Sequence, residues 1–204
     1  MGHVLSREGM RPSPDLVEAV ANYPIPSTVR QVRGFLGLAG YYRTYIDGFA
    51  LLAPPLTELL KKNVTFSWSS SHQKAFDALR DHLTKRPVLA FANYNRPFYV
   101  KTDWSKFALG GVLSQFDDEG KEHPVAYLSR RCRGKERVYS ARGGEAVALW
   151  YCVMKWRPFL EGREFIVQSD HLSLNALRRP QEDAKLQRVV TELEHCAFTI
   201  EHKF

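Results

Sequence analysis

Residues 101–115 read Lys101-Thr102-Asp103-Trp104-Ser105-Lys106-Phe107-Ala108-Leu109-Gly110-Gly111-Val112-Leu113-Ser114-Gln115 and predict a strand, an acidic residue, a turn and a second strand. The apolar run at 97–100 leads into the first strand, and Asp103 stands where that strand ends. Because successive side chains of a strand point to opposite faces, Trp104 shares a face with Val100, and Asp103 lies on the other. A carboxylate on a rigid strand end is well placed to bind a metal ion.

The composition is that of a globular chain. Its 204 residues, 44% of them hydrophobic and 25% charged, suffice for one large domain or two small ones. The longest apolar run, at 146–154, has nine residues, whereas a membrane span needs about 20, so we expect no membrane partner. No signal-peptide pattern begins the chain, and three cysteines without Cys-x-x-Cys spacing suit a reducing compartment. We therefore expect an intracellular protein, cytoplasmic or nuclear.

The charge balance favours polyanionic partners. The formal net charge is +7, and arginines gather along a helix expected after residue 28 and after a strand expected at 124–129. The candidate nucleic-acid contacts are Arg30, Arg33, Arg43, Arg130, Arg131 and Arg133. For the first three, a solvated helix face is an equally good explanation. Charge alone therefore leaves open both a nucleic-acid-binding protein and a merely basic one.

The first part of the chain carries helix signals. Ser13-Pro14-Asp15 predicts one helix start, and Ser27-Thr28 predicts a second. Gly34, Gly37 and Gly40 recur every third residue along the second helix, but no Gly-Lys-Ser/Thr follows them, which excludes a phosphate-binding loop. These glycines instead predict close packing of another backbone against the helix.

From residue 97 onward the apolar pattern changes to a period of two. After the strand that ends at Asp103, it predicts strands at 107–115, 124–129, 165–169 and 198–201. A helix apolar nearly all round is predicted from Ser140 to about Phe159, and weaker helices at 173–177 and 183–194. The helix that follows Ser140 is therefore expected to be buried.

Three carboxylates share one pattern in this region. Asp103 and Asp170 each end a strand, and Glu145 lies early in the buried helix. Acids at strand ends beside an apolar helix can converge above a sheet, and their hard oxygen atoms suit Mg²⁺ or Mn²⁺. Two such ions activate a water and stabilise the leaving oxygen in phosphodiester hydrolysis. The pattern is that of a metal-dependent nuclease, although each acid taken alone is more commonly a solvated strand end.

A family resemblance rests on several motifs. They are Thr102-Asp103-Trp104-Ser105, Gly110-Gly111-Val112-Leu113-Ser114-Gln115, His123-Pro124-Val125-Ala126-Tyr127-Leu128-Ser129-Arg130, Tyr139-Ser140, Lys155-Trp156-Arg157, Phe159-Leu160-Glu161-Gly162 and Ser169-Asp170-His171. These motifs resemble the RNase H domain of gypsy-type LTR-retrotransposon reverse transcriptases. Upstream, Phe35-Leu36-Gly37-Leu38 with Tyr41-Tyr42-Arg43 resembles the thumb of the same Pol polyprotein. Val4-Leu5-Ser6 resembles the end of its palm.

The resemblance implies an α+β fold. Its RNase H-like mixed sheet, in the order βββαβαβ and flanked by helices, would follow a small helical thumb-like subdomain. Residues 1–62 would form the palm end and thumb-like region, and residues 63–204 the RNase H-like domain without its C-terminal end.

The resemblance also implies a reaction. A ribonuclease H would cleave the RNA strand of RNA/DNA hybrids, with Asp103, Glu145 and Asp170 as catalytic residues that carry Mg²⁺ or Mn²⁺. Partners would be the hybrid or other nucleic acid and the remaining parts of reverse transcriptase. The chain carries no polymerase active site, so we expect no polymerisation.

Three departures from the family pattern predict an impaired enzyme. A fourth acid expected after the last strand does not occur before Phe204. Trp104 stands where the family often has a small residue, and Gly143 and Gly144 weaken the first turn of the helix that carries Glu145. We therefore expect a frayed helix start and a poorly fixed Glu145. The alternative function is an inactive element-derived remnant that binds nucleic acid or protein.

Overall fold

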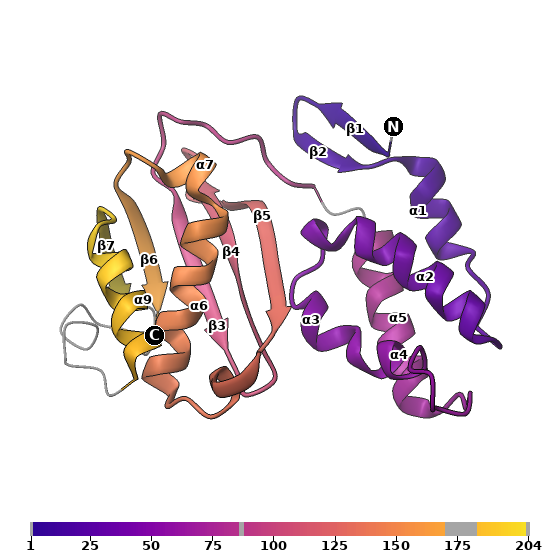
Figure 1. Ribbon diagram of the computed structural model, residues 1–204. Helices are drawn as coiled ribbons and strands as arrows, with labels where there is room; N and C mark the ends of the chain where they lie inside the picture. The colour runs from indigo at the N-terminus through magenta and orange to yellow at the C-terminus, as the bar shows by residue number, and fades with distance from the viewer. Residues whose placement is uncertain (1, 86–87, 170–182, 203–204) are drawn as a thin grey trace. The chain divides into compact units, whose positions relative to one another are not determined.

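The computed structural model describes residues 2–85, 88–169 and 183–202 and divides the chain into two compact units, Met1–Phe91 and Ala92–Phe204 (Figure 1). This division falls later than the boundary predicted between residues 62 and 63. Helix α5 (Ser70–Thr84) packs against helices of the first unit, and the ring of its Phe76 lies 4.5 Å from that of Phe35. The apolar stripe of α5 is therefore part of the first core.

The first unit is a hairpin followed by helices. Its elements are β1 (His3–Ser6), β2 (Gly9–Pro12), α1 (Pro14–Ala21), α2 (Val29–Tyr41), η1 (Arg43–Tyr45), α3 (Phe49–Leu52), α4 (Pro54–Glu58) and α5. Helix α1 begins at Pro14, and Thr28 caps α2 by accepting a hydrogen bond from the backbone N–H of Gln31 at 3.3 Å. Both predicted helix starts are confirmed.

The predicted packing of a backbone against the glycines of α2 is wrong. A Cβ atom on Gly37 or Gly40 would meet no described atom within 4 Å, and one on Gly34 would meet only the Tyr23 side chain. The reason is that α2 buries its opposite side, with Val32, Phe35 and Ala39 fully enclosed. The glycines therefore leave bare backbone on the outward side of α2.

Gly9→Ala is expected to destabilise the first unit by roughly 2 kcal/mol. Gly9 has φ +134°, and a Cβ there would overlap the carbonyl oxygen of Leu89, whose strand-like bridge to Met10 closes the hairpin onto the chain. Gly37→Ala is the matched control, because helix propensity should make it stabilising by up to about 1 kcal/mol. Urea unfolding followed by circular dichroism would measure both changes. Equal unfolding midpoints for the two variants would contradict this expectation.

The second unit is built on a mixed five-stranded sheet. The strands are β3 (Tyr99–Trp104), β4 (Ala108–Phe116), β5 (Glu122–Arg131), β6 (Phe165–Ser169) and β7 (Phe198–His202), in the spatial order β5-β4-β3-β6-β7. Neighbours β3, β4 and β5 pair antiparallel, whereas β6 pairs parallel with both β3 and β7. With helices between β5, β6 and β7, the predicted βββαβαβ order and α+β class are confirmed.

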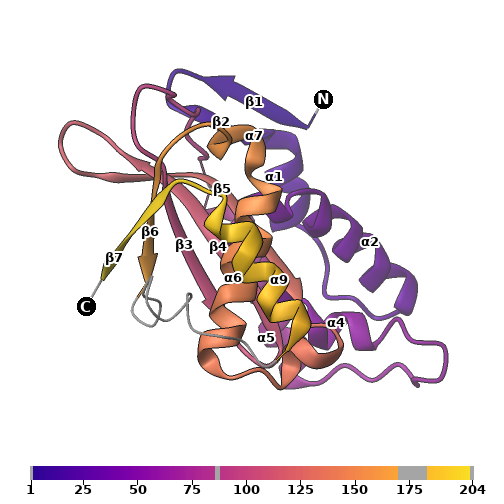
Figure 2. The same cartoon turned by 60° about the vertical axis from the view of Figure 1, so that its left-hand side comes forward.

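The described part of this unit also contains helices. They are α6 (Ala141–Lys155), α7 (Arg157–Leu160) and α9 (Ala184–Glu194), with a short turn of helix η2 (Gly134–Arg137) before them. Helix α6 packs against β3 and β4, and α9 lies beside α6 (Figure 2). Helix α6 ends earlier than predicted, because Pro158 has no N–H to continue its hydrogen bonds. The helix expected at 173–177 lies outside the described residues.

Two expectations from the sequence concern the helices and cysteines of the described residues. None of the helices within the described ranges has the length and apolar character needed to cross a bilayer. Cys132, Cys152 and Cys196 are all free thiols, as their spacing predicted.

Candidate active site

Strand β3 places Asp103 near its C-terminal end. Asp103 pairs in register with Gly110 of β4, and its side chain is exposed. Strand β6 runs parallel to β3, with Gln168 opposite Lys101, so both strands end at the same edge of the sheet. The described part of β6 ends at Ser169, and Asp170, the next predicted ligand, lies outside the described residues.

Helix α6 brings Glu145 to this strand end. Glu145 is the fifth residue of α6, is only 6% exposed, and accepts a hydrogen bond at 3.3 Å from the backbone N–H of Trp104 to its Oε1. Since Trp104 follows Asp103 directly, two of the three predicted acids lie at one end of β3.

The expected fraying of the helix start is wrong. Helix α6 begins at Ala141, directly after Ser140, whose Oγ accepts a hydrogen bond at 3.3 Å from the Gly143 N–H. Gly143 and Gly144 are both buried inside the helix, and Glu145 is held by the hydrogen bond from β3. Tertiary contacts thus outweigh the low helix propensity of the two glycines.

The side chain of Trp104 explains why residue 144 is a glycine. A Cβ atom on residue 144 would lie 2.5 Å from Trp104 Cε3 and closer still to Cδ2 and Cε2. The indole therefore occupies the space that any side chain at position 144 would need. The two departures noted in the sequence, the large residue at 104 and the glycine at 144, are a single structural arrangement.

A buried carboxylate that the sequence did not single out lies beside this contact. Glu136, only 2% exposed, accepts hydrogen bonds from Arg130 Nη1 at 2.6 Å and Nη2 at 3.0 Å, from Lys185 Nζ at 2.9 Å and from the Arg133 N–H at 2.9 Å. Burial alone would raise the pKa of Glu136, but these donors, Arg130 foremost, hold it at about 2. We call Glu136, Arg130 and Lys185 the Glu136 cluster. In the sequence, only the position of Glu136 as the single acid within the basic run at 130–137 could have indicated this cluster.

The turn of helix η2 is also joined to helix α9 through Lys135 and Asp183. Asp183 caps α9 by accepting hydrogen bonds from the N–H groups of Lys185 and Leu186, and it pairs with Lys135 at 3.3 Å. Asp183 therefore serves as the N-cap of α9.

The predicted nucleic-acid contacts differ in their surroundings. Arg130 is engaged: its side chain is 15% exposed, it pairs with Glu136, and its guanidinium lies 4.5 Å from the centre of the Tyr151 ring. Arg30 and Arg33 on α2 and Arg43 on η1 are exposed in the first unit, and Arg131 and Arg133 are exposed in the second.

The oxygen atoms offered at the end of β3 are of the type that binds a hard divalent cation. Asp103 and Glu145 both offer carboxylate oxygens, which Mg²⁺ and Mn²⁺ prefer. Within residues 2–85, 88–169 and 183–202, no three His, Cys, Asp or Glu side chains gather closely enough to hold a metal ion. The third predicted ligand, Asp170, lies outside these ranges.

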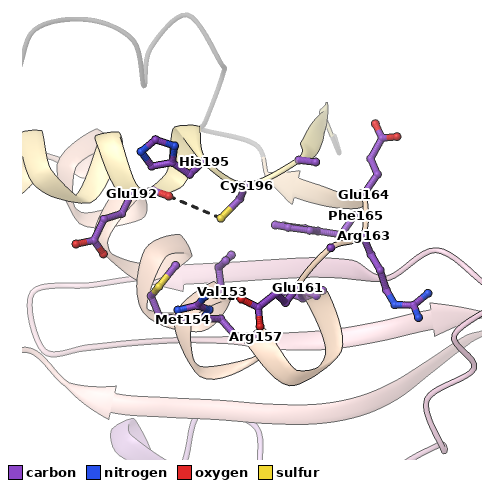
Figure 3. A pocket seen from close by; sticks show the side chains of 13 residues that line it. Val153, Met154, Arg157, Glu161, Arg163, Glu164, Phe165, Glu192, His195 and Cys196 are labelled. Atoms are coloured by element: carbon purple, nitrogen blue, oxygen red, sulfur yellow. Dashed lines mark hydrogen bonds and ion pairs between the residues drawn. The ribbon is translucent and has the colours of Figure 1, made fainter.

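A cavity of about 570 Å³ lies at the other end of α6. Its lining comes from the end of α6, from α7 and from the residues that follow α9, and includes Val153, Phe165 and Cys196 (Figure 3). Val153 lies eight residues beyond Glu145, roughly 12 Å along the helix axis. Neither Asp103 nor Glu145 is among the described residues that line this cavity.

Comparisons with known proteins agree with this geometry. Residues 68–167 match the family described as an RNase H-like domain found in reverse transcriptase. The retrovirus-related Pol polyproteins of transposon 297 and transposon gypsy, both from Drosophila melanogaster, are 35% and 34% identical over 99% and 92% of this chain. This chain spans 19% of the length of each polyprotein.

A solved structure shares the fold. The foamy viral protease-reverse transcriptase in complex with RNA/DNA hybrid matches 100% of this chain and 28% of its own, with a TM-score of 0.79 at 19% identity. The polyprotein identity extends over nearly the whole chain, and the RNase H-like match covers the strand and helix that carry Asp103 and Glu145. The chain therefore carries an RNase H-like domain of the reverse-transcriptase family, in a sequence that is similar over nearly its whole length to part of the gypsy-type LTR-retrotransposon Pol polyproteins.

Proposed function

We propose that this chain hydrolyses the RNA strand of RNA/DNA hybrids, with Asp103, Glu145 and Asp170 as the residues that bind Mg²⁺ or Mn²⁺. The observation that carries the proposal is the position of Glu145. Glu145 is buried in α6, and its Oε1 accepts a hydrogen bond from the backbone N–H of Trp104, the residue that follows Asp103. The family description and the relative solved with RNA/DNA hybrid support the same reaction.

The two described acids would bind the metal ions from different surroundings. Asp103 and Glu145 would hold the divalent ions, which when bound lower the pKa of a water and stabilise the leaving oxygen. Asp103 is exposed, so a scissile phosphate can approach it from solvent. Glu145 is buried, and the Trp104 N–H fixes the direction of one of its oxygens. A site with one open and one enclosed acid orients its ligands while it stays accessible to a duplex.

The proposed nucleic-acid contacts include the outward side of α2. Arg30 and Arg33 share this side with Gly34 and Gly37 at helical spacing, and all four residues are exposed. Arginines beside bare backbone allow a phosphate backbone to come close. By the same family resemblance, we propose that residues 1–62 act as the end of the palm and a thumb-like region.

A cleavage assay tests the proposed reaction. The chain is incubated with Mg²⁺ or Mn²⁺ and one labelled RNA, presented as a hybrid with DNA, as a single strand and as an RNA duplex. We expect cleavage of the hybrid alone, and we expect EDTA to stop it. Salt-sensitive binding of the hybrid without cleavage would overturn the proposal in favour of an inactive binding remnant.

The double variant Arg30→Ala/Arg33→Ala is expected to weaken hybrid binding by roughly 10-fold at low salt. Each lost phosphate contact lowers the slope of log affinity against log salt by about 0.9, so the slope should fall by about 2. Arg188→Ala is the matched control, because its side chain is 81% exposed and already pairs with Glu192 on the same helix. Fluorescence anisotropy over a salt series would measure the slopes. An unchanged slope for the double variant would remove these two arginines from the interface.

A further inference from the structure

We propose that Trp104 and Gly144 form a size-matched pair that positions Glu145, with Trp104 as a positioning residue of the candidate active site. The inference rests on the proposed function, since it concerns how that site keeps one of its acids in place. It assigns a role to two residues that looked like damage in the sequence.

The contact between Trp104 and Gly144 is steric. Trp104 is the last residue of β3, and its indole lies against the backbone of Gly144 in α6. Three ring atoms lie within 2.5 Å of where a Cβ would stand on residue 144. These atoms belong to a rigid ring system and not to the end of a flexible chain. The ring therefore fits only against a glycine, and it sets the separation between α6 and β3.

The second step is that Trp104 is held at both ends. Its backbone N–H donates to Glu145 Oε1 at 3.3 Å, and its indole Nε1–H donates to the backbone carbonyl of Glu136 at 3.2 Å. A ring with a fixed edge and a fixed backbone has little freedom to turn. The strand residue that touches Glu145 is thus immobilised by contacts with two other elements, α6 and η2.

The third step concerns what holds η2. The side chain of Glu136 is clamped by Arg130 from β5 and Lys185 from α9. The carbonyl that receives the indole N–H is therefore part of a segment fixed by buried charges from two neighbouring elements. The path from the Glu136 cluster to Glu145 runs through Trp104, and each link in it is a direct contact.

The neighbouring glycine provides the matched control. A Cβ on Gly143 would lie 3.1 Å from Leu186 Cδ1, the free end of a flexible side chain. Gly143→Ala should therefore be tolerated, whereas Gly144→Ala should force the indole away and shift the carboxylate of Glu145. The two variants add the same methyl group to consecutive residues in the first turn of α6, so they separate positioning from helix propensity.

The experiment compares the full chain with Gly144→Ala, Trp104→Ala, the double variant Trp104→Ala/Gly144→Ala and Gly143→Ala. We measure thermal unfolding by circular dichroism, the Kd for Mn²⁺ by calorimetry, and kcat and KM on the labelled hybrid. We expect Gly144→Ala to lower the unfolding midpoint by on the order of 10 °C and to weaken Mn²⁺ binding by roughly 10-fold. Its kcat should fall with little change in KM.

The double variant decides the proposal. It removes the ring that clashes with the new methyl group and keeps the backbone N–H of residue 104. We expect its unfolding midpoint to rise above that of Gly144→Ala, because the clash is removed. Its Mn²⁺ affinity and kcat, like those of Trp104→Ala alone, should stay roughly 10-fold below those of the original chain, because no indole fixes residue 104. If Gly144→Ala does not fold, a folded double variant shows the same recovery.

Two outcomes would overturn the inference. One is a double variant that unfolds no later than Gly144→Ala or that binds Mn²⁺ as tightly as the original chain, and the other is a Gly144→Ala variant that behaves like Gly143→Ala. A failure of the proposed function looks different. In that case the original chain leaves the hybrid intact, while the recovery of the unfolding midpoint in the double variant and the weaker Mn²⁺ binding of both Trp104 variants are still observed.

Discussion

Asp103→Asn is expected to lower hybrid cleavage by roughly 10³-fold and to leave the fold intact. The carboxylate at the end of β3 would supply a charged ligand to the metal ions, and an amide would weaken a transition state that such ions stabilise by several kcal/mol. Because the side chain is exposed, its loss creates neither a cavity nor a buried polar group without a partner. Single-turnover cleavage of the labelled hybrid at saturating Mg²⁺ would measure the change in rate.

The control for this variant is Asp118→Asn. Asp118 lies in the turn between β4 and β5, its side chain is 92% exposed, and its partner is Arg96 at 2.8 Å. Removing that charge should leave cleavage unchanged, because the turn lies outside the candidate site. If Asp103→Asn cleaved the hybrid as fast as Asp118→Asn, Asp103 would be excluded as a catalytic residue.

Glu136→Gln is expected to destabilise the second unit by about 3 kcal/mol. The change leaves the guanidinium of Arg130, enclosed between Glu136 and the Tyr151 ring, without its negative partner. A buried ion pair is strongly destabilised when one partner is removed, because the remaining charge stays away from water. Three of the four tryptophans, Trp104, Trp150 and Trp156, lie in this unit, so urea unfolding followed by tryptophan fluorescence would report mainly on it.

The same cluster predicts a dependence of stability on pH. The pKa of Glu136 is lowered from 4.5 to about 2, so the folded state binds a proton more weakly than the unfolded state does. Its contribution is fully present above pH 4.5 and is lost as the pH falls from 4.5 toward 2. By linkage it amounts to about 3 kcal/mol. Glu136→Gln should lose this part of the acid sensitivity, and unfolding curves between pH 2 and 6 would show the difference.

Glu161→Gln is the matched control for the charge change. Glu161 pairs with Arg157 at 2.5 Å, but both side chains are more than half exposed. An exposed pair of this kind contributes at most about 1 kcal/mol. If both variants lost the same stability, the Glu136 cluster would be no more important than a surface ion pair.

Local patterns were sufficient to predict most of the elements. The alternation at 97–115 and the run at 165–169 predicted strands of the sheet, because period-two patterns reflect one buried face. Pro14 and Thr28 marked helix starts correctly, because capping acts over a single turn. Pro158 was overlooked as the stop of α6, although its effect is also local.

Predictions that depended on packing were less successful. The glycines of α2 were expected to contact another backbone, but spacing alone does not say whether a helix side is covered or open. An apolar stripe such as that of α5 indicates burial without naming its partner, and in the structure α5 packs against α1 and α4. Glu136 looked like one acid in a basic run, since its burial depends on side chains from β5 and α9.

By itself, the sequence determined the order of strands and helices, the family and the candidate acids Asp103, Glu145 and Asp170. These follow from local periodicity and from motifs, which a chain carries whether or not it is folded. Only the tertiary structure decided that Trp104 and Gly144 belong together and that Glu145 is held at the end of β3. Residues 104 and 144 are far apart in sequence, and their fit is a matter of excluded volume, which exists only once strand and helix are packed.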